Sequence, residues 1–420
     1  MPLPLHVVTL LVALVATSAT AATLRVPPEP GRLEAALAAS APGDRLVLAA
    51  GRHTGPVTVA QSVSLEGEPG AVIDGGGSGR VVTIDAPQVT LRGLTIEGSG
   101  SDLAAEDGGI FVTQRGAGSV IENNRLLGNL IGIDLKGPRA ATVRRNAIEG
   151  RQDGQMSERG NAVNVWNSPG SVIESNDIRY GRDGIFVLTS KSNVIRGNHL
   201  RDLRFAVHYM YADNGTVADN ESTGNHVGYA LMFSAGLTVE SNRSIGDRDH
   251  GLLLNYATSA KVNGNAVVNG GDKCVFIYNS TKNIFRGNWF EGCEIGIQLT
   301  AGSERNAISG NAFLGNRNQV KYVGTRFQEW SEQGRGNYWS DNAAFDLNGD
   351  GLADQPYRPN DLVDRVVWTY SLAKLLLNSP AVQTVRFAQG QFPALFPGGV
   401  VDSFPLMAPP RVAAAVEPGR

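Results

Sequence analysis

Three residues of this chain combine donor types suited to a soft metal ion. His208 and Met210 are two positions apart in a segment of alternating apolar residues, and Met232 follows Met210 after 22 residues. Side chains two apart on a strand share one face, and a 22-residue repeat would place Met232 in the same column as Met210. Thioether sulfur is a soft ligand that favours Cu(I) over harder cations. These residues therefore predict a copper site, although methionines that simply fill a protein interface explain the same pattern.

The residues around them predict an apolar strip that would face outward. In the predicted strands, outward side chains alternate with inward ones. The outward apolar side chains are those of Phe186, Leu188, Leu253, Phe276 and Tyr278. A contiguous apolar surface on a soluble protein usually marks a contact with a partner. His226 and His250 lie close to the same predicted sheet and are candidates for a further ligand.

A second metal-type pattern lies near the C-terminus. Asp346, Asn348, Asp350 and Asp354 stand at relative positions 1, 3, 5 and 9, with Gly351 at position 6. This spacing matches the first part of an EF-hand calcium loop. Position 12, which normally supplies a bidentate glutamate, is a tyrosine. The loop therefore predicts a calcium site with an incomplete set of ligands, and a turn without metal is the alternative.

A recurring asparagine identifies the scaffold that positions these residues. Asparagines follow one another at intervals of 22, 30, 22, 22, 22, 23, 23 and 23 residues, at positions 124, 146, 176, 198, 220, 242, 265, 288 and 311. Short segments with a period of two lie between them, which indicates strands. We expect an all-β, right-handed parallel β-helix of ten to twelve coils, with asparagines at left-handed corners that hydrogen-bond up and down the stack.

The ends of the chain differ from this repeat. Residues 1–21 hold an apolar run and an Ala-x-Ala site, which predict a secretory signal peptide; a buried segment or a membrane anchor is the alternative. Residues 22–320 would form the β-helix, with Arg32–Ser40 as a capping helix. Residues 321–420 would form an extension with the calcium-type loop and an apolar helix after Leu362. That helix would cap the rod and also dock on another protein.

The two cysteines are in adjacent predicted coils but out of register. Cys274 aligns with a column of glycines three residues away from the column of Cys293. In an extended segment their Cα atoms would be too far apart for a disulfide, whereas a tight turn would bring them together. Our interpretation slightly favours two buried, unpaired thiols.

The charge composition argues against one class of function, nucleic-acid binding. With 37 basic and 40 acidic residues, the chain lacks the positive surplus of a nucleic-acid binder. Parallel β-helices include polysaccharide lyases, epimerases and hydrolases, so an exported enzyme of this kind is the rival hypothesis. Such an enzyme needs converging carboxylates or acidic metal ligands with a base. The outward columns do not contain that arrangement, and we expect a protein that is not an enzyme.

Several segments together resemble the NosD family of accessory proteins for maturation of nitrous oxide reductase. They are the capping helix with Ala41–Asp44, the asparagine-punctuated coils, Gly336–Asp341, Asp346–Arg358 and Val401–Leu406. The resemblance covers nearly the whole chain after the signal peptide. It implies a periplasmic β-helix that associates with a membrane permease and a cytoplasmic ATPase of an ABC-type complex. It also implies contact with a copper chaperone and with the reductase, whose copper-sulfur centre is assembled. The resemblance does not assign the copper ligands.

Overall fold

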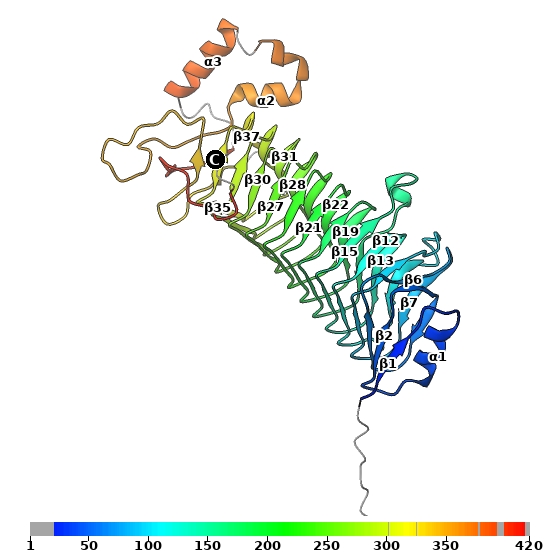
Figure 1. The fold of residues 1–420 in the computed structure, drawn as a ribbon. Coiled ribbons are helices and arrows are strands. Elements are labelled where there is room, and N and C mark those ends of the chain that lie inside the picture. The colour runs from blue at the N-terminus through cyan, green and yellow to red at the C-terminus, as the bar shows by residue number, and fades with distance from the viewer. Residues whose placement is uncertain (1–20, 301, 325, 377–378, 393–398, 416–420) are drawn as a thin grey trace, which may run out of the picture.

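The protein is a rod of stacked coils (Figure 1). The computed structural model describes residues 21–300, 302–324, 326–376, 379–392 and 399–415. The predicted signal peptide therefore lies almost entirely outside the described residues. Each coil contributes one strand to each of three long parallel sheets, so consecutive strands of one sheet are three elements apart in the chain. This is the predicted parallel β-helix, and its strands are short because the chain turns three times in each coil.

The first sheet has 13 strands. They are β1 (Thr23–Val26), β2 (Arg45–Leu48), β5 (Ser64–Gly67), β8 (Thr90–Arg92), β11 (Val120–Glu122), β14 (Thr142–Arg144), β17 (Val172–Glu174), β20 (Val194–Arg196), β23 (Thr216–Ala218), β26 (Thr238–Glu240), β29 (Lys261–Asn263), β32 (Ile284–Arg286) and β35 (Ala307–Ser309).

The second sheet has 12 strands and carries the predicted copper and partner residues. They are β4 (Val57–Val59), β7 (Arg80–Ile84), β10 (Gly108–Val112), β13 (Ile131–Lys136), β16 (Val163–Trp166), β19 (Asp183–Leu188), β22 (Phe205–Met210), β25 (Val227–Met232), β28 (His250–Asn255), β31 (Lys273–Tyr278), β34 (Ile295–Thr300) and β37 (Asn318–Val323).

The third sheet again has 13 strands. They are β3 (Gly51–Thr54), β6 (Ala71–Asp74), β9 (Thr95–Glu97), β12 (Arg125–Asn129), β15 (Ala147–Gly150), β18 (Asp177–Arg179), β21 (His199–Arg201), β24 (Glu221–Thr223), β27 (Arg243–Ile245), β30 (Ala266–Val268), β33 (Trp289–Glu291), β36 (Ala312–Leu314) and β39 (Tyr338–Trp339). The 13 strands of the first and third sheets slightly exceed the ten to twelve coils expected from the repeat, because the irregular N-terminal coils add strands.

Helices lie at both ends of the rod. Helix α1 (Arg32–Ala39) packs Leu33 and Leu37 against the first coil, as the sequence predicts for a cap. The 30-residue interval between asparagines accommodates the 3-10 helix η1 (Met156–Glu158). At the other end, α2 (Leu362–Thr369), η2 (Ser371–Leu376) and α3 (Pro380–Gln391) project beyond the coils, next to the short strand pair β38 (Gln328–Glu329) and β40 (Val400–Val401) (Figure 1).

The predicted boundary at residue 320 falls within β37. That strand pairs with β34 as a further rung of the second sheet, and β39 pairs with β36 in the third. The extension is also attached to the rod through Asp402, which is buried. Its carboxylate accepts hydrogen bonds from the backbone N–H of Asn337 at 2.7 Å and from Trp339 Nε1 at 2.8 Å.

The repeated asparagines form a buried hydrogen-bond ladder. Asn220, for example, donates from its backbone N–H and from Nδ2 to Asn242 Oδ1 at 3.0 and 2.9 Å, and from Nδ2 to the Ile195 carbonyl at 2.9 Å. The expected hydrogen bonds are therefore present. The expected left-handed backbone is displaced by one residue: Asp219 and Ser241, which precede the ladder asparagines, have φ of 54° and 56°. The side-chain amide of each asparagine makes the ladder hydrogen bonds, and the residue before it adopts the left-handed conformation at the corner of the coil.

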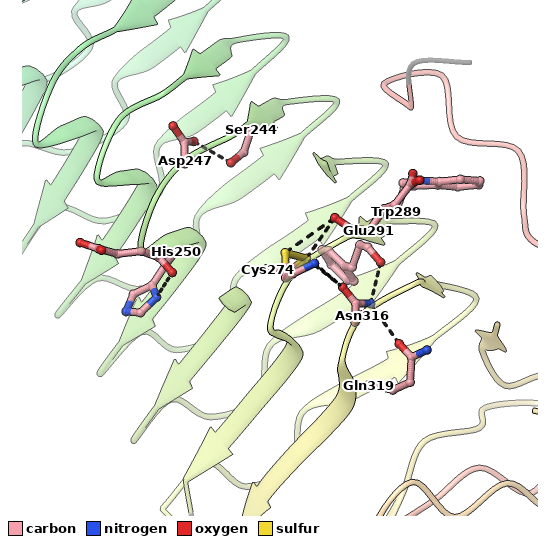
Figure 2. Close-up of a disulfide and its surroundings, with 11 residues drawn as sticks. Ser244, Asp247, His250, Cys274, Trp289, Glu291, Asn316 and Gln319 are labelled. Atoms are coloured by element: carbon pink, nitrogen blue, oxygen red, sulfur yellow. Dashed lines mark hydrogen bonds between the residues drawn. A yellow bond between two sulfur atoms is a disulfide. The ribbon is translucent and has the colours of Figure 1, made fainter. Parts of the chain in front are cut away.

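The prediction of two unpaired thiols is wrong. Cys274 and Cys293 form a buried disulfide with a Cα–Cα distance of 5.7 Å (Figure 2). The segment before β34 turns at Gly292, whose φ is 72°, instead of continuing as an extended chain, and this turn cancels the difference in register. Gly270 leaves room for the bridge, since a Cβ atom there would lie 2.8 Å from Cys293 Sγ.

Candidate metal centre and partner surface

Strand register on the second sheet gathers the predicted residues into two adjacent outer columns. In the first column, Phe186, His208, Ala230, Leu253 and Phe276 are direct neighbours from strand to strand. In the second, the neighbours run in the order Leu188, Met210, Met232, Asn255 and Tyr278. Paired strands are about 4.8 Å apart, so the two methionines stand side by side. The structure therefore brings His208, Met210 and Met232 onto one small area of the sheet.

His208 is held in a buried polar network. Only 6% of the residue is exposed, and its Nδ1 lies 3.1 Å from Asp183 Oδ2. The same carboxylate accepts two hydrogen bonds from Arg204, at 2.7 Å from Nε and 2.6 Å from Nη2. Burial by itself would raise the pKa of Asp183, but the hydrogen bond from His208 and the charge of Arg204 outweigh it and hold that pKa below its usual value. The carboxylate is therefore ionised at neutral pH.

The other ring nitrogen of His208 is left without a partner. Nε2 is buried and has no hydrogen-bond partner among the described residues. The rings of Phe186 and Phe205 pack on the imidazole, with centroid separations of 4.7 and 4.9 Å. A buried polar atom without a partner is costly, so its presence calls for a functional explanation. A metal ion could reach Nε2 only after a neighbouring side chain moves.

The available donors suit a soft monovalent ion better than a hard cation. No group of three or more His, Cys, Asp or Glu side chains is placed to hold a metal ion in the described part of the chain. Methionine sulfur provides the additional donors here, since Met210 and Met232 are half-buried and pair with each other in the column next to His208. One imidazole nitrogen and two thioether sulfurs form a ligand set that Cu(I) accepts. The residues present therefore fit a transient copper ion.

The two further histidine candidates belong to a separate group. His226 Nδ1 lies 3.2 Å from Asp249 Oδ2, and His250 Nδ1 lies 2.6 Å from the Asp249 carbonyl. Burial, together with the charge of Lys273, lowers the pKa of His250. His250 lies on β28, two strands from the strand of His208, and packs edge-on against Phe276. The structure does not bring either residue to His208.

The predicted apolar strip is a small hydrophobic cluster on the outside of the rod. Val227, Ala230 and Leu253 are buried there, and Phe205, Met232 and Phe276 pack around them. Leu253 is thus covered by its neighbours and contributes little exposed area. Phe186 and Leu188 are half-buried, and 40% of Tyr278 is exposed. The strip is apolar as expected, but much of it is already packed within the chain.

An exposed row of aromatic side chains beside the strip was missed by sequence reasoning. Tyr211, Phe233 and Tyr256 stack with centroid separations of 4.9 and 5.1 Å, and Tyr278 continues the row. Each of the first three follows directly after an outward side chain of the second column, at a corner with positive φ. Their spacing of 22, 23 and 22 residues was the available signal. The row enlarges the apolar surface next to Met210 and Met232.

The calcium-type loop is closed by its own backbone. Asp346 Oδ1 accepts from Gly349 N–H at 2.6 Å and Oδ2 accepts from Gly351 N–H at 2.8 Å, while Asp354 Oδ2 accepts from Leu347 N–H at 2.8 Å. Asn348 Oδ1 accepts from the backbone N–H of Asp350 at 2.9 Å. These are Asx-type turns. These hydrogen bonds order the loop, and each carboxylate keeps further lone pairs that could contact an ion.

Two buried carboxyl groups, which in an enzyme could act as acid or base, make hydrogen bonds within the β-helix. Asp134, on the outer face of β13, accepts from Asn164 Nδ2 at 2.7 Å, and burial raises its pKa. Asp247 occupies a position of a second hydrogen-bond ladder and accepts from the N–H of Asn225 at 2.8 Å. The two acids therefore have separate, local partners. Within the described residues, no helix is long and apolar enough to cross a membrane.

Comparison with known proteins gives the family. The family model described as "Periplasmic copper-binding protein (NosD)" matches residues 144–344. A relative from Stutzerimonas stutzeri, named "Probable ABC transporter binding protein NosD", is 46% identical over 381 residues, which is 87% of each chain. A relative of the same name from Pseudomonas aeruginosa is 44% identical over 403 residues, or 93% of each chain.

A solved structure supports the fold alone. The family 28 exopolygalacturonase of Yersinia enterocolitica is 8% identical, with a TM-score of 0.51 over 70% of this chain and 79% of that one. The curated relatives are named as binding proteins, not enzymes. With its identity to them over most of its length, the chain belongs to the NosD family of periplasmic copper-binding proteins.

Proposed function

We propose that this protein is a non-catalytic scaffold subunit of an ABC-type complex that matures the copper-sulfur centre of nitrous oxide reductase. It receives copper from a chaperone and docks the reductase in the periplasm. The observation that carries the copper step is the buried, unpartnered Nε2 of His208 beside the paired sulfurs of Met210 and Met232. The description of the family model supports the link to copper, and the names of the relatives support the link to an ABC transporter.

In this proposal the face of the second sheet is the docking surface for the chaperone or the reductase. Phe186, Leu188, Phe276 and Tyr278 belong to it, the buried Leu253 supports it through the same cluster, and the aromatic row from Tyr211 to Tyr278 extends it. A docked protein would displace water from the half-buried rings, which favours association. It would also move the side chains that cover His208, which would ease the transfer of copper to or from Nε2.

The projecting helices are proposed to dock on the membrane permease, whose cytoplasmic ATPase completes the complex. Leu372 and Leu375 of η2 are 79% and 84% exposed, and Tyr370 and Phe387 are also exposed. Exposed aliphatic and aromatic side chains in such numbers are typical of a surface that is covered by a partner. We therefore assign the permease contact to α2, η2 and α3.

A copper titration tests the central step. Purified protein is titrated with Cu(I) in competition with a chromogenic chelator, and we expect one strongly bound ion that is lost in the His208→Ala, Met210→Ala, Met232→Ala variant. A matched variant, His199→Ala with Met407→Ala, removes an exposed histidine and an exposed methionine elsewhere and should bind copper normally. Unchanged Cu(I) binding in the triple variant would refute the site.

A further inference from the structure

Asp183 is the part of the His208 environment that the sequence did not predict. It lies at the start of β19, is 1% exposed, and contacts His208 Nδ1 at 3.1 Å while it is paired with Arg204. Asp183 on β19, His208 on β22 and Arg204 immediately before β22 thus form one hydrogen-bonded unit on the outer face of the sheet. Neither methionine belongs to this unit, so its effect on a metal ion must act through the imidazole.

The hydrogen bonds of Asp183 decide which nitrogen of His208 carries the proton. Both oxygens of the Asp183 carboxylate already accept N–H donors of Arg204, so this group is an acceptor toward His208 as well and Nδ1 is the donor. In the neutral imidazole, Nε2 then has the free lone pair, and Nε2 is the nitrogen without a partner. Arg204 reinforces this arrangement because its two hydrogen bonds fix the orientation of the carboxylate.

We propose that Asp183 is a positioning residue for copper: it holds His208 in the Nδ1–H tautomer and so presents the Nε2 lone pair to the ion. This inference rests on the proposed function of His208 as a copper ligand. A carboxylate that orients a metal-binding histidine in this way usually contributes 10–100-fold in metal affinity. A purely structural alternative is that Asp183 and Arg204 only tie β19 to β22.

The experiment first measures the tautomer in the metal-free protein. Long-range ¹H–¹⁵N correlation spectra of the imidazole distinguish Nδ1–H from Nε2–H, and we expect His208 to be in the Nδ1–H form. In Asp183→Asn the amide cannot accept from both Arg204 and His208 as the carboxylate does, so we expect Nε2–H to become populated. Cu(I) affinity should fall about 10–100-fold while the stoichiometry of one is kept.

Two control variants separate positioning from structure. Asp249→Asn changes a second Asp–His pair, in which His226 Nδ1 lies 3.2 Å from Asp249 Oδ2, and should leave Cu(I) binding unchanged. Arg204→Gln removes the guanidinium but leaves the Asp183–His208 hydrogen bond, so it should keep the Nδ1–H tautomer. If the unit were only structural, Arg204→Gln and Asp183→Asn would lower thermal stability and copper affinity together.

The possible failures are distinct. An Nε2–H tautomer in the wild-type apo protein would overturn the inference even if Asp183→Asn did not fold. Wild-type Cu(I) affinity in a folded Asp183→Asn variant would overturn it as well, while loss of copper from the triple His/Met variant would leave the proposed function standing. Normal copper binding by the triple variant would instead refute the proposed function, and the inference with it.

Discussion

Replacing Asp247 by asparagine should stabilise the β-helix at neutral pH. Asp247 Oδ2 accepts hydrogen bonds from the hydroxyls of Ser222 and Ser244, both at 2.6 Å, and Oδ1 accepts from Asn225 N–H. Asn225 makes the equivalent ladder contact one coil earlier, with the N–H of Leu203. An asparagine therefore fits the position without a charge (Figure 2 shows Asp247 beside Ser244).

The size of the effect follows from the pKa of this carboxyl. Burial raises the pKa of Asp247 from 3.8 to about 6, against the hydrogen bonds from the two serines and Asn225, which lower it. A shift of this size corresponds to about 3 kcal/mol of unfavourable free energy when the folded protein is ionised. Asp247→Asn removes that cost. Its Nδ2 takes the place of Oδ2 and can only donate to the serine hydroxyls, so two short hydrogen bonds to a carboxylate become weaker neutral ones and the net gain at pH 7 should be smaller.

The pH dependence gives the cleaner measurement. Because the folded pKa lies above the unfolded one, the folded state binds the proton more tightly, and stability from this group rises as the pH falls through about 6. Between pH 7 and pH 5 the wild-type protein should gain about 1.4 kcal/mol relative to Asp247→Asn. The difference between the two proteins isolates this group, since their other titrations are shared.

Urea unfolding at pH 7 and pH 5, followed by circular dichroism, measures this difference. Asp202→Asn, which changes an exposed carboxyl, is the control and should keep the pH dependence of the wild type. Parallel pH profiles for the wild type and Asp247→Asn would refute the reasoning, because they would mean that the buried carboxyl stays ionised at no cost to the folded state.

Three further predictions concern the other structural elements. Replacing Cys274 and Cys293 by serine removes a disulfide that closes a loop with a sequence separation of 19, and should lower the free energy of unfolding by about 3 kcal/mol. Urea unfolding of the variant and of the oxidised wild type measures this difference. Equal stability of the two proteins would contradict a structural role for the disulfide. Asn220→Ala removes the four hydrogen bonds of this side chain, in which Nδ2 donates to the Ile195 carbonyl and Asn242 Oδ1 and Oδ1 accepts from the N–H and Nδ2 of Asn198. The change should cost about 2–4 kcal/mol, against little for the exposed Thr223→Ala, as thermal unfolding will show. We also predict that residues 346–354 bind Ca²⁺ weakly. Calorimetry should detect binding of Ca²⁺ to the wild type and no binding to Asp346→Asn. If the wild type releases no heat at millimolar Ca²⁺, the loop is a turn without metal.

Much of the architecture was accessible from the sequence because a solenoid repeats its local rules. The period of two in segments such as Phe205–Met210 identifies strands, and the 22-residue interval places Met210 next to Met232 without any knowledge of long-range contacts. The same logic could have found the row that includes Tyr211 and Tyr256. Where the repeat is interrupted, as at Gly292, the register argument failed and the disulfide was missed.

The sequence by itself determined the repeat, the family and the two adjacent columns that contain His208 and the two methionines, because each of these depends on spacing within or between similar coils. Only the tertiary structure decided that Asp183 and Arg204 meet at His208, that Leu253 is covered, and that the cysteines are joined. The physical reason is that side-chain direction, burial and turn geometry depend on contacts between coils. The spacing of residues in the sequence determines which of them are neighbours on adjacent strands. Packing and hydrogen bonding determine whether those neighbours are buried, paired or exposed.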